Sequence, residues 1–344
     1  MRAIRRQVLV LLIASAMAMA NSTVMAAEAT HLPVDVAPEQ LLPGEYLWHP
    51  EIAPAGPLLM VVDLPTQRAT LYRNGVRIAV TTVSTGKAGK DTPPGVFTIL
   101  QKHATHFSSL YDAAPMPFMQ RLTWDGIALH AGRIPGYPAS HGCVRLPLEF
   151  ARHLFAVTDL GMTVVVADTG TLAPQARSGW LAPSLQGDVE APAPLARATL
   201  DWHPERAPTG PLTLLLSGAD HTVRVLRNGV EIGTSPINLA GMALHGTHVL
   251  QMQAGATAIG SRFVADAPRL RWTHVALDGS GDPAGDDATL EMLYASVQVP
   301  PDFARVVYAQ LQPGTTVVFT DLALPVEAAT QSVLETGADP ADDR

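Results

Sequence analysis

The sequence RATLYRNGVRIAVTTVS, at Arg68–Ser84, determines the fold of the region around it. Two segments rich in Val, Ile and Thr, Arg68–Tyr72 and Arg77–Ser84, flank the pair Asn74-Gly75. Such segments are typical of β-strands. Asn-Gly favours a type I′ turn, in which both central residues need a positive φ. The stretch therefore predicts an antiparallel hairpin. Short segments of the same composition predict two further strands, at Leu58–Asp63 and Val96–Leu100.

The chain repeats itself. Two motifs of the N-terminal half recur 154 positions later, and another recurs 153 positions later, with order and spacing kept. Self-similarity of this kind predicts two homologous domains rather than one large domain, as does a length of 344 residues. The repeated motifs are Trp48–Glu51 with Trp202–Glu205, Arg73–Val76 with Arg227–Val230, and Gly161–Asp168 with Gly314–Asp321.

The repeat and the changes in composition predict the domain organisation. Most segments are predicted strands, and LEFARHLFAV after Pro147 has the apolar spacing of a short helix. We expect a mainly β fold with few short helices, duplicated in tandem. The predicted boundaries are 1–26 for a signal peptide, 27–45 for an N-terminal extension, 46–168 for the first domain, 169–199 for an Ala/Pro-rich linker that suits a flexible tether, 200–321 for the second domain and 322–344 for an acidic disordered tail.

The N-terminus predicts export. Three arginines precede an apolar run from Val8 to Ala20, and Val24-Met25-Ala26 fits the small-x-small cleavage pattern. The alternative is a membrane anchor, but the run is shorter than the roughly 20 residues a spanning helix needs. We therefore expect a mature protein without a membrane span.

Composition excludes some classes of function. The net charge of −8, without long basic runs, argues against nucleic-acid binding. The single cysteine, Cys143, cannot form an intramolecular disulfide. A free thiol in an exported protein is either an inert, packed side chain or a reactive group.

The residues near Cys143 favour reactivity. It lies in Ser140-His141-Gly142-Cys143-Val144-Arg145-Leu146, after a strand-like segment that ends at His130. A thiol nucleophile needs a base, donors for an oxyanion and a substrate anchor. His130 or His141 could be the base, Gly142 permits close approach of the backbone, and Arg145 could pair with a substrate carboxylate.

This motif resembles the signature of the L,D-transpeptidase catalytic domain family, in which a histidine precedes a Ser/Thr-His-Gly-Cys loop that is followed by Arg or Asn. The resemblance spans roughly Leu58–Ala167 and includes Ser84-Thr85-Gly86 and Thr92-Pro93-Pro94-Gly95. It implies an L,D-transpeptidase-like β-sandwich. It also implies a role for each residue: Cys143 as acylated nucleophile, His130 as general base oriented by the Ala131 carbonyl, Ser140, His141 and Gly142 as the oxyanion loop, and Arg145 as a substrate contact.

Two features concern the cleft. The spacer Ala131–Ala139 is shorter than the family usually shows, which affects the expected shape of the acceptor side. The apolar, Pro-broken stretch Tyr111–Met119 is either a loop over the cleft or an ordinary packed segment. As a loop it would place Tyr111, Met116 and Phe118 against the substrate.

A zinc site is the alternative use of His130, His141 and Cys143. No CxxC or HExxH spacing accompanies them. His103 and His106 could also reach a metal, but polar loop residues are the simpler interpretation. We expect no metal and no cofactor.

The resemblance implies a reaction on peptidoglycan tetrapeptide stems. Cys143 would form a thioester, release D-alanine and pass the acyl group to an amine, and a carbapenem would acylate the same thiol. With water as acceptor the enzyme would be an L,D-carboxypeptidase. A cell-wall binding protein without activity is a further alternative. By analogy with the family we expect a Gram-negative periplasm, with stem peptides as partners.

The second copy is predicted to be catalytically inactive. At an offset of 153, Cys143 corresponds to Ser296, His141 to Tyr294 and Arg145 to Gln298. An offset of 148 places Asp278 at the position of His130. Without a basic partner, Ser296 is not expected to be a nucleophile.

Overall fold

The computed structural model describes residues 36–108, 114–168, 200–239, 247–276, 286–321 and 323–324, without the side chains of 275–276 and 286–290. The predicted signal peptide, the linker and all but two residues of the predicted tail lie outside this part. The described chain is mainly β, which confirms the predicted fold class. None of its helices has the length and apolar character needed to span a membrane.

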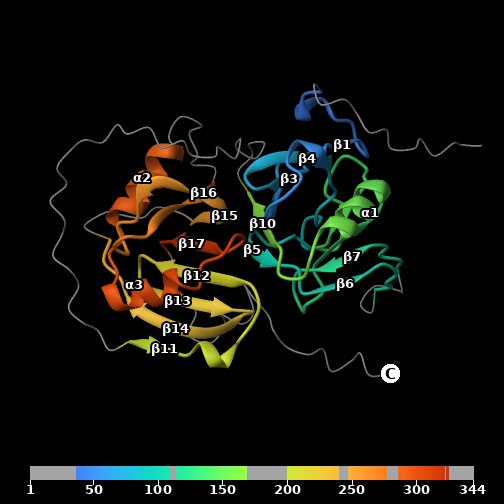
Figure 1. Ribbon diagram of the computed structural model, residues 1–344. Helices are drawn as coiled ribbons and strands as arrows, with labels where there is room; N and C mark the ends of the chain where they lie inside the picture. Colours follow the sequence, from blue (N-terminus) through green and yellow to red (C-terminus); the bar gives the residue numbers. More distant parts are fainter. Residues whose placement is uncertain are drawn as a thin grey trace, which may run out of the picture.

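The first half is built on a six-stranded sheet with the order β1-β4-β3-β2-β10-β5 (Figure 1). Neighbours in this sheet pair antiparallel, except that β10 runs parallel to β2. Its strands are β1 (Tyr46–Trp48), β2 (Leu58–Asp63), β3 (Arg68–Arg73), β4 (Val76–Thr82), β5 (Gly95–Thr98) and β10 (Thr163–Ala167).

The predicted hairpin is present between β3 and β4. Asn74 has φ 50° and Gly75 has φ 77°, the positive pair that a type I′ turn requires. The second strand ends at Thr82, two residues before the predicted end. Ser84 instead forms an isolated antiparallel bridge with Arg145, so the chain leaves the sheet in order to meet the loop that carries Cys143.

A separate four-stranded sheet lies beside the first and has the order β6-β7-β8-β9. The strands β8 and β9 run parallel and place His130 opposite Arg145. The helix α1 (Leu148–Val157) comes directly after β9, with Pro147 at its N-cap. The four strands are β6 (Gln101–His103), β7 (Met119–Arg121), β8 (Ala128–Ala131) and β9 (Val144–Leu146).

One apolar core joins these elements. Leu129 and Val144 from the small sheet, Phe150 from α1 and Met60 from the large sheet are all fully buried in the same cluster. Trp48 packs its ring edge-on against Phe150, with 5.5 Å between centroids. The core therefore fixes β8, which carries the predicted base, and β9, which begins just after the predicted nucleophile.

The second half repeats the large sheet. Its order, β11-β14-β13-β12-β17-β15-β16, matches the first sheet strand for strand as far as β15. Asn228 and Gly229 have φ 49° and 77°, which reproduces the type I′ turn. The elements are β11 (Asp201–Trp202), β12 (Leu212–Ser217), β13 (Thr222–Arg227), β14 (Val230–Pro236), β15 (Thr247–Gly260), β16 (Pro268–Ala276), α2 (Asp286–Ser296), α3 (Pro301–Tyr308) and β17 (Thr316–Thr320).

The halves diverge after β5 in the first and its counterpart β15 in the second. The long strand β15 continues into the hairpin with β16, and both belong to the large sheet. The strand β16 pairs antiparallel with the long strand β15, as β7 pairs antiparallel with β6. By this pairing β16 corresponds to β7. The offset of 148, which aligned Ala276 with Ala128 of β8, therefore does not agree with the strand pairing, and Asp278 itself lies outside the described residues.

The two large sheets pack face to face through apolar side chains (Figure 1). The contact is symmetric in sequence, because residues that correspond in the repeat meet in one cluster. The hydroxyl groups of Thr163 and Thr316, which lie 153 positions apart in the sequence, form a hydrogen bond of 2.8 Å. The corresponding pairs are Val61 with Leu215, Tyr72 with Leu226, Val96 with Val249, and Val165 with Val318.

Candidate active site

A pocket of about 530 Å³ contains both Cys143 and His130. Its walls come from β7, β8 and the loop before β9, together with the segment around Met116. Ser140, His141, Arg145 and Ala131 also line it. The structure therefore brings most of the residues predicted to form the site into one cavity.

The Cys143 thiol lies at the base of this pocket, half-buried against an apolar cluster of Met116, Met119 and Ala128. It donates a hydrogen bond to the Gly126 carbonyl at 3.3 Å. Burial raises the pKa of the thiol, and a hydrogen bond from the Ala128 backbone opposes this rise. The group is therefore a protonated thiol at neutral pH, and its attack needs a base.

His130 has the properties of that base. Its Nδ1 lies 2.8 Å from the Ala131 carbonyl, and because a carbonyl only accepts, Nδ1 must carry the hydrogen. Nε2 is then the proton acceptor. Burial, together with the charges of Arg145 and His106, lowers the pKa of His130 to about 4 although the hydrogen bond to the Ala131 backbone raises it, so the ring is neutral at pH 7.

Ser140 holds the loop that carries the thiol. Its hydroxyl donates to the Cys143 carbonyl at 2.5 Å and accepts from the Gly142 amide at 3.1 Å. Gly142 has φ 114°, and a Cβ there would lie 2.7 Å from Ile127 Cδ1. The Gly142 amide is thus already engaged, whereas among the described hydrogen bonds none uses the Cys143 amide.

The motifs Ser84–Gly86 and Thr92–Gly95 support this loop from behind. Thr92 Oγ1 accepts from the Gly86 amide at 2.9 Å and donates to the Gly142 carbonyl at 2.7 Å. The Thr85 carbonyl accepts from the amides of Ala139 and Ser140. A Cβ at Gly86 would lie 2.1 Å from the Lys90 carbonyl, so only glycine fits. The two motifs position the loop rather than the substrate.

Arginines give the pocket a positive potential. Arg145, on β9, and Arg121, on β7, both lower the pKa of Cys143. Arg121 is held by Gln101, whose Oε1 accepts from its Nε at 2.8 Å, and lies over the Trp124 ring. Arg121 was not predicted from the sequence, because no local motif links β7 to the loop before β9.

The segment Tyr111–Met119 lines the pocket through several of its residues, but not through all of those predicted. Met116 lines the pocket. Phe118 does not: it packs on the core and against the Phe155 ring, with 5.8 Å between centroids. Phe118 therefore packs inside the protein instead of taking its predicted position against the substrate. Tyr111 lies outside the described residues. His141 is exposed at the pocket rim.

The metal alternative has no ligand set in the described part of the chain, where no three His, Cys, Asp or Glu side chains gather around one point. His103 and His106 stack their rings at 5.8 Å, and His106 also lines the pocket. His103 ends the strand β6 rather than lying in a loop as expected, and His106 lies in the segment that follows it.

The second half keeps the frame of the site but not its groups. Asn238 and Gln298 form an isolated antiparallel bridge, as Ser84 and Arg145 do, which supports the alignment of Gln298 with Arg145. Ser296 then falls at the end of α2, where its hydroxyl donates to the Leu293 carbonyl at 3.1 Å. The position of the thiol is thus occupied by a helix end.

Comparison with known proteins identifies the first half. Residues 57–166 match the family model of the L,D-transpeptidase catalytic domain, YkuD. This segment, which holds the whole pocket, therefore matches the L,D-transpeptidase catalytic domain family that the motifs resemble. The search of curated proteins found no match.

Solved structures of L,D-transpeptidases are similar to about a third of the chain. An enzyme from Stackebrandtia nassauensis is 34% identical over 35% of this chain and 60% of its own, with a TM-score of 0.31. One from Mycobacterium tuberculosis is 22% identical over 33% and 59%, with a TM-score of 0.32. L,D-transpeptidase 3 of M. tuberculosis, solved with a faropenem-derived adduct, is 22% identical over 33% and 60%, with a TM-score of 0.30. The chain thus spans about 60% of their lengths.

Proposed function

We propose that this protein is an exported L,D-transpeptidase that acts on peptidoglycan tetrapeptide stems through a thioester on Cys143. The observation that carries the proposal is the pairing, in one pocket of a matched catalytic domain, of a protonated thiol with a neutral, backbone-oriented imidazole. We assign the protein to the periplasm because its N-terminal arginines and apolar run have the pattern of a signal peptide.

The first step is acylation. His130 Nε2 takes the thiol proton while Sγ forms a bond to the carbonyl carbon of the third stem residue. The carbonyl oxygen becomes an oxyanion that the Cys143 amide can receive. When the oxyanion collapses, the C–N bond breaks, and the proton on His130 passes to the departing nitrogen of D-alanine. A thioester and a neutral imidazole remain.

The second step resolves the thioester. An amine attacks the same carbonyl carbon, His130 takes the proton that the amine loses, and the C–S bond breaks with return of that proton to sulfur. A new amide forms, and the step needs neither an oxidant nor a metal. With water as acceptor the product would be a free tripeptide acid, the L,D-carboxypeptidase outcome.

The thiol must also give up a hydrogen bond before it reacts. Its proton is directed at the Gly126 carbonyl, and this contact must be released before His130 can take the proton. The cationic side chains of Arg121 and Arg145 suit a substrate rich in carboxylates. Arg145 is the residue we assign to the donor stem.

The direct test is product analysis. Incubation of the mature chain with purified disaccharide-tetrapeptide should release D-alanine, seen by mass spectrometry together with a dimer or, with water, a tripeptide. A carbapenem should add its mass to the peptide that contains Cys143. The matched control is Cys143→Ala, which should give neither signal. A folded wild-type protein that releases no D-alanine and forms no adduct would refute the proposal.

A further inference from the structure

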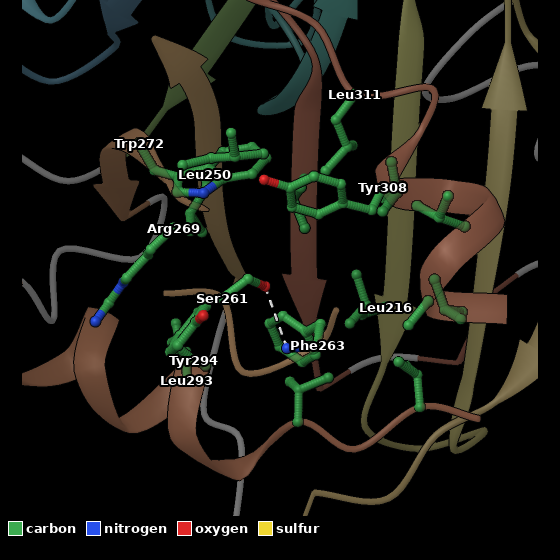
Figure 2. A pocket seen from close by; sticks show the side chains of 18 of the residues that line it. Leu216, Leu250, Ser261, Phe263, Arg269, Trp272, Leu293, Tyr294, Tyr308 and Leu311 are labelled. Carbon is green, nitrogen blue, oxygen red and sulfur yellow. Dashed lines mark hydrogen bonds between the residues drawn. The ribbon is translucent and has the colours of Figure 1, made fainter. Parts of the chain in front are cut away.

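The second half contains an apolar cavity of about 180 Å³ that the proposed reaction does not use. It lies between the sheet face of β12, β15 and β17, the hairpin β15–β16, and the helices α2 and α3. Figure 2 shows Tyr308 and Leu311 on one side of it and Phe263, Leu293 and Tyr294 on the other. Its walls are almost entirely aliphatic and aromatic.

The cavity arises where the two halves differ. In the first half, β8 inserts the fully buried Leu129 between the large sheet and α1. The pairing of β16 gives it the place of β7, and the described part of the second half has no counterpart of β8. The helix α3 and the sheet keep their positions, with Trp202 packed edge-on against Phe303. This frame borders the cavity within the described residues.

The hydroxyl groups in the cavity wall are already engaged within the protein. Tyr308 Oη donates to the Pro268 carbonyl at 2.6 Å, and Tyr294 Oη accepts from the Arg262 amide at 3.0 Å. Ser261 Oγ accepts from the Phe263 amide at 3.2 Å, drawn as the dashed line in Figure 2. The interior offers a ligand apolar surface and few hydrogen bonds, so its occupant there must be apolar.

The charge at the edge is positive. Two arginines, Arg269 and Arg271, line the cavity, and no acidic residue is among its described lining side chains. Arg269 pairs with Glu291 at 2.7 Å and lies over the Tyr294 ring, with its guanidinium directed away from the cavity in Figure 2. Among the described ion pairs none involves Arg271, so its charge is available to an anion.

We propose that this cavity is a binding site for a small amphipathic anion, a carboxylate whose aliphatic tail fills the cavity while its head group pairs with Arg271. A dry engineered cavity of about 150 Å³ binds benzene, a molecule of six carbons. By proportion, a cavity of 180 Å³ takes a tail of about seven carbons. The site stands on the second half alone and does not depend on the reaction at Cys143.

The test is a chain-length series of linear carboxylates from butyrate to dodecanoate, titrated calorimetrically into the full chain below their micelle concentrations. Each buried methylene should raise affinity about fourfold. We expect this rise to continue to about octanoate and then to level off, because later carbons stay in water. Alkyltrimethylammonium ions of equal length carry the opposite charge and should bind more weakly.

Variants locate the site. Ala304→Leu adds three carbons to the wall from the buried side of α3 and should move the plateau about three carbons lower. Arg271→Gln should weaken the binding of carboxylates by about two- to fivefold without changing how steeply affinity rises with chain length. Arg305→Gln, the same change at an exposed position on α3 that pairs with Asp302, is the matched control and should change nothing.

A quenching measurement covers the case in which Ala304→Leu does not fold. Trp272 lines the cavity, so 8-bromooctanoate should quench part of the tryptophan emission, and Trp272→Phe should remove that part. Affinity that does not depend on chain length, or quenching that persists in Trp272→Phe, would overturn the proposal. Equal binding of carboxylates and ammonium ions would overturn the assignment of Arg271.

Discussion

The two halves of the chain share a frame and differ in what it supports. Both have the same strand order, the same Asn-Gly turn with positive φ, and the same edge-on contact between a tryptophan and a phenylalanine. Within the described residues, only the first half has a separate second sheet, and that sheet carries His130 and Arg145. The large sheet and its helix are thus common to both halves, whereas the residues that we propose for the reaction lie on β8, β9 and one loop of the first half.

The largest contrast is expected at the position of the nucleophile. Cys143→Ala should abolish D-alanine release, because no other thiol exists in the chain, while leaving the thermal transition of the protein nearly unchanged. Ser296→Ala, at the corresponding position, should leave the rate as it is. Both variants are assayed with tetrapeptide by mass spectrometry. Lost activity in Ser296→Ala would show that the second half takes part in catalysis.

The base gives the next largest effect. His130→Gln should lower the rate of carbapenem acylation by roughly 10²–10⁴-fold, the usual contribution of general-base catalysis. His141→Gln, which changes an exposed histidine at the rim of the same pocket, should lower it by much less. Stopped-flow measurement of acylation separates the two. The opposite order would assign the base to His141.

The pH dependence of stability should also distinguish His130. Its pKa is about 4 in the folded protein and about 6.5 in the unfolded chain, so the unfolded state binds more protons between these values. Stability is then complete above pH 6.5 and falls as the pH drops toward 4. Urea titrations should show a loss of about 2 kcal/mol between pH 7.5 and 5 that His130→Gln lacks. An unchanged slope in the variant would contradict the low pKa.

Removing the hydroxyl that supports the loop should have a moderate effect. Thr92→Val leaves the buried Gly86 amide and Gly142 carbonyl without their partner, which costs about 1–3 kcal/mol. Because the loop carries Cys143, acylation should slow as well. Thr163→Val, which removes a buried hydroxyl from the contact between the halves, should lower stability but not the acylation rate. Equal kinetic losses would mean that Thr92 acts only through stability.

The smallest effect compares the two turns. Glycine accepts positive φ, so Asn228→Gly should change stability by only a few tenths of a kcal/mol. Asn74→Gly should cost about 1 kcal/mol more, because Asn74 Oδ1 also accepts from the Ala254 amide at 2.6 Å across the two halves. Urea midpoints of the two variants measure the difference. Identical midpoints would show that this hydrogen bond does not contribute to stability.

Much of the fold could be predicted because its signals are local. The Asn74-Gly75 turn, the helix after Pro147 and the repeat all rest on short patterns, and the structure confirms the turn and the helix. The predicted domain boundaries, and a signal peptide that lies outside the described residues, stay predictions. The motif around Cys143 also predicted which side chains would meet, since β8 and β9 are parallel neighbours.

The features that could not be predicted depend on long-range packing. Thr92 reaches Gly142 across 50 positions, and Arg121 approaches the thiol from another strand of the small sheet. The cavity of the second half is lined by residues of the sheet, a hairpin and two helices that lie far apart in the sequence, so no local motif marks it. Phe118 was assigned to the substrate from composition alone, whereas tertiary contacts turn its ring into the core.

The hydroxyl contact between Thr163 and Thr316 lies in an interface where equivalent residues of the two halves meet. In a dimer of identical subunits such a contact dissociates on dilution, and every substitution acts on both sides at once. Here the partners are tethered in one chain, so their effective concentration is set by the tether and not by the amount of protein. The apolar faces stay covered however scarce the protein is, and each face can change by itself.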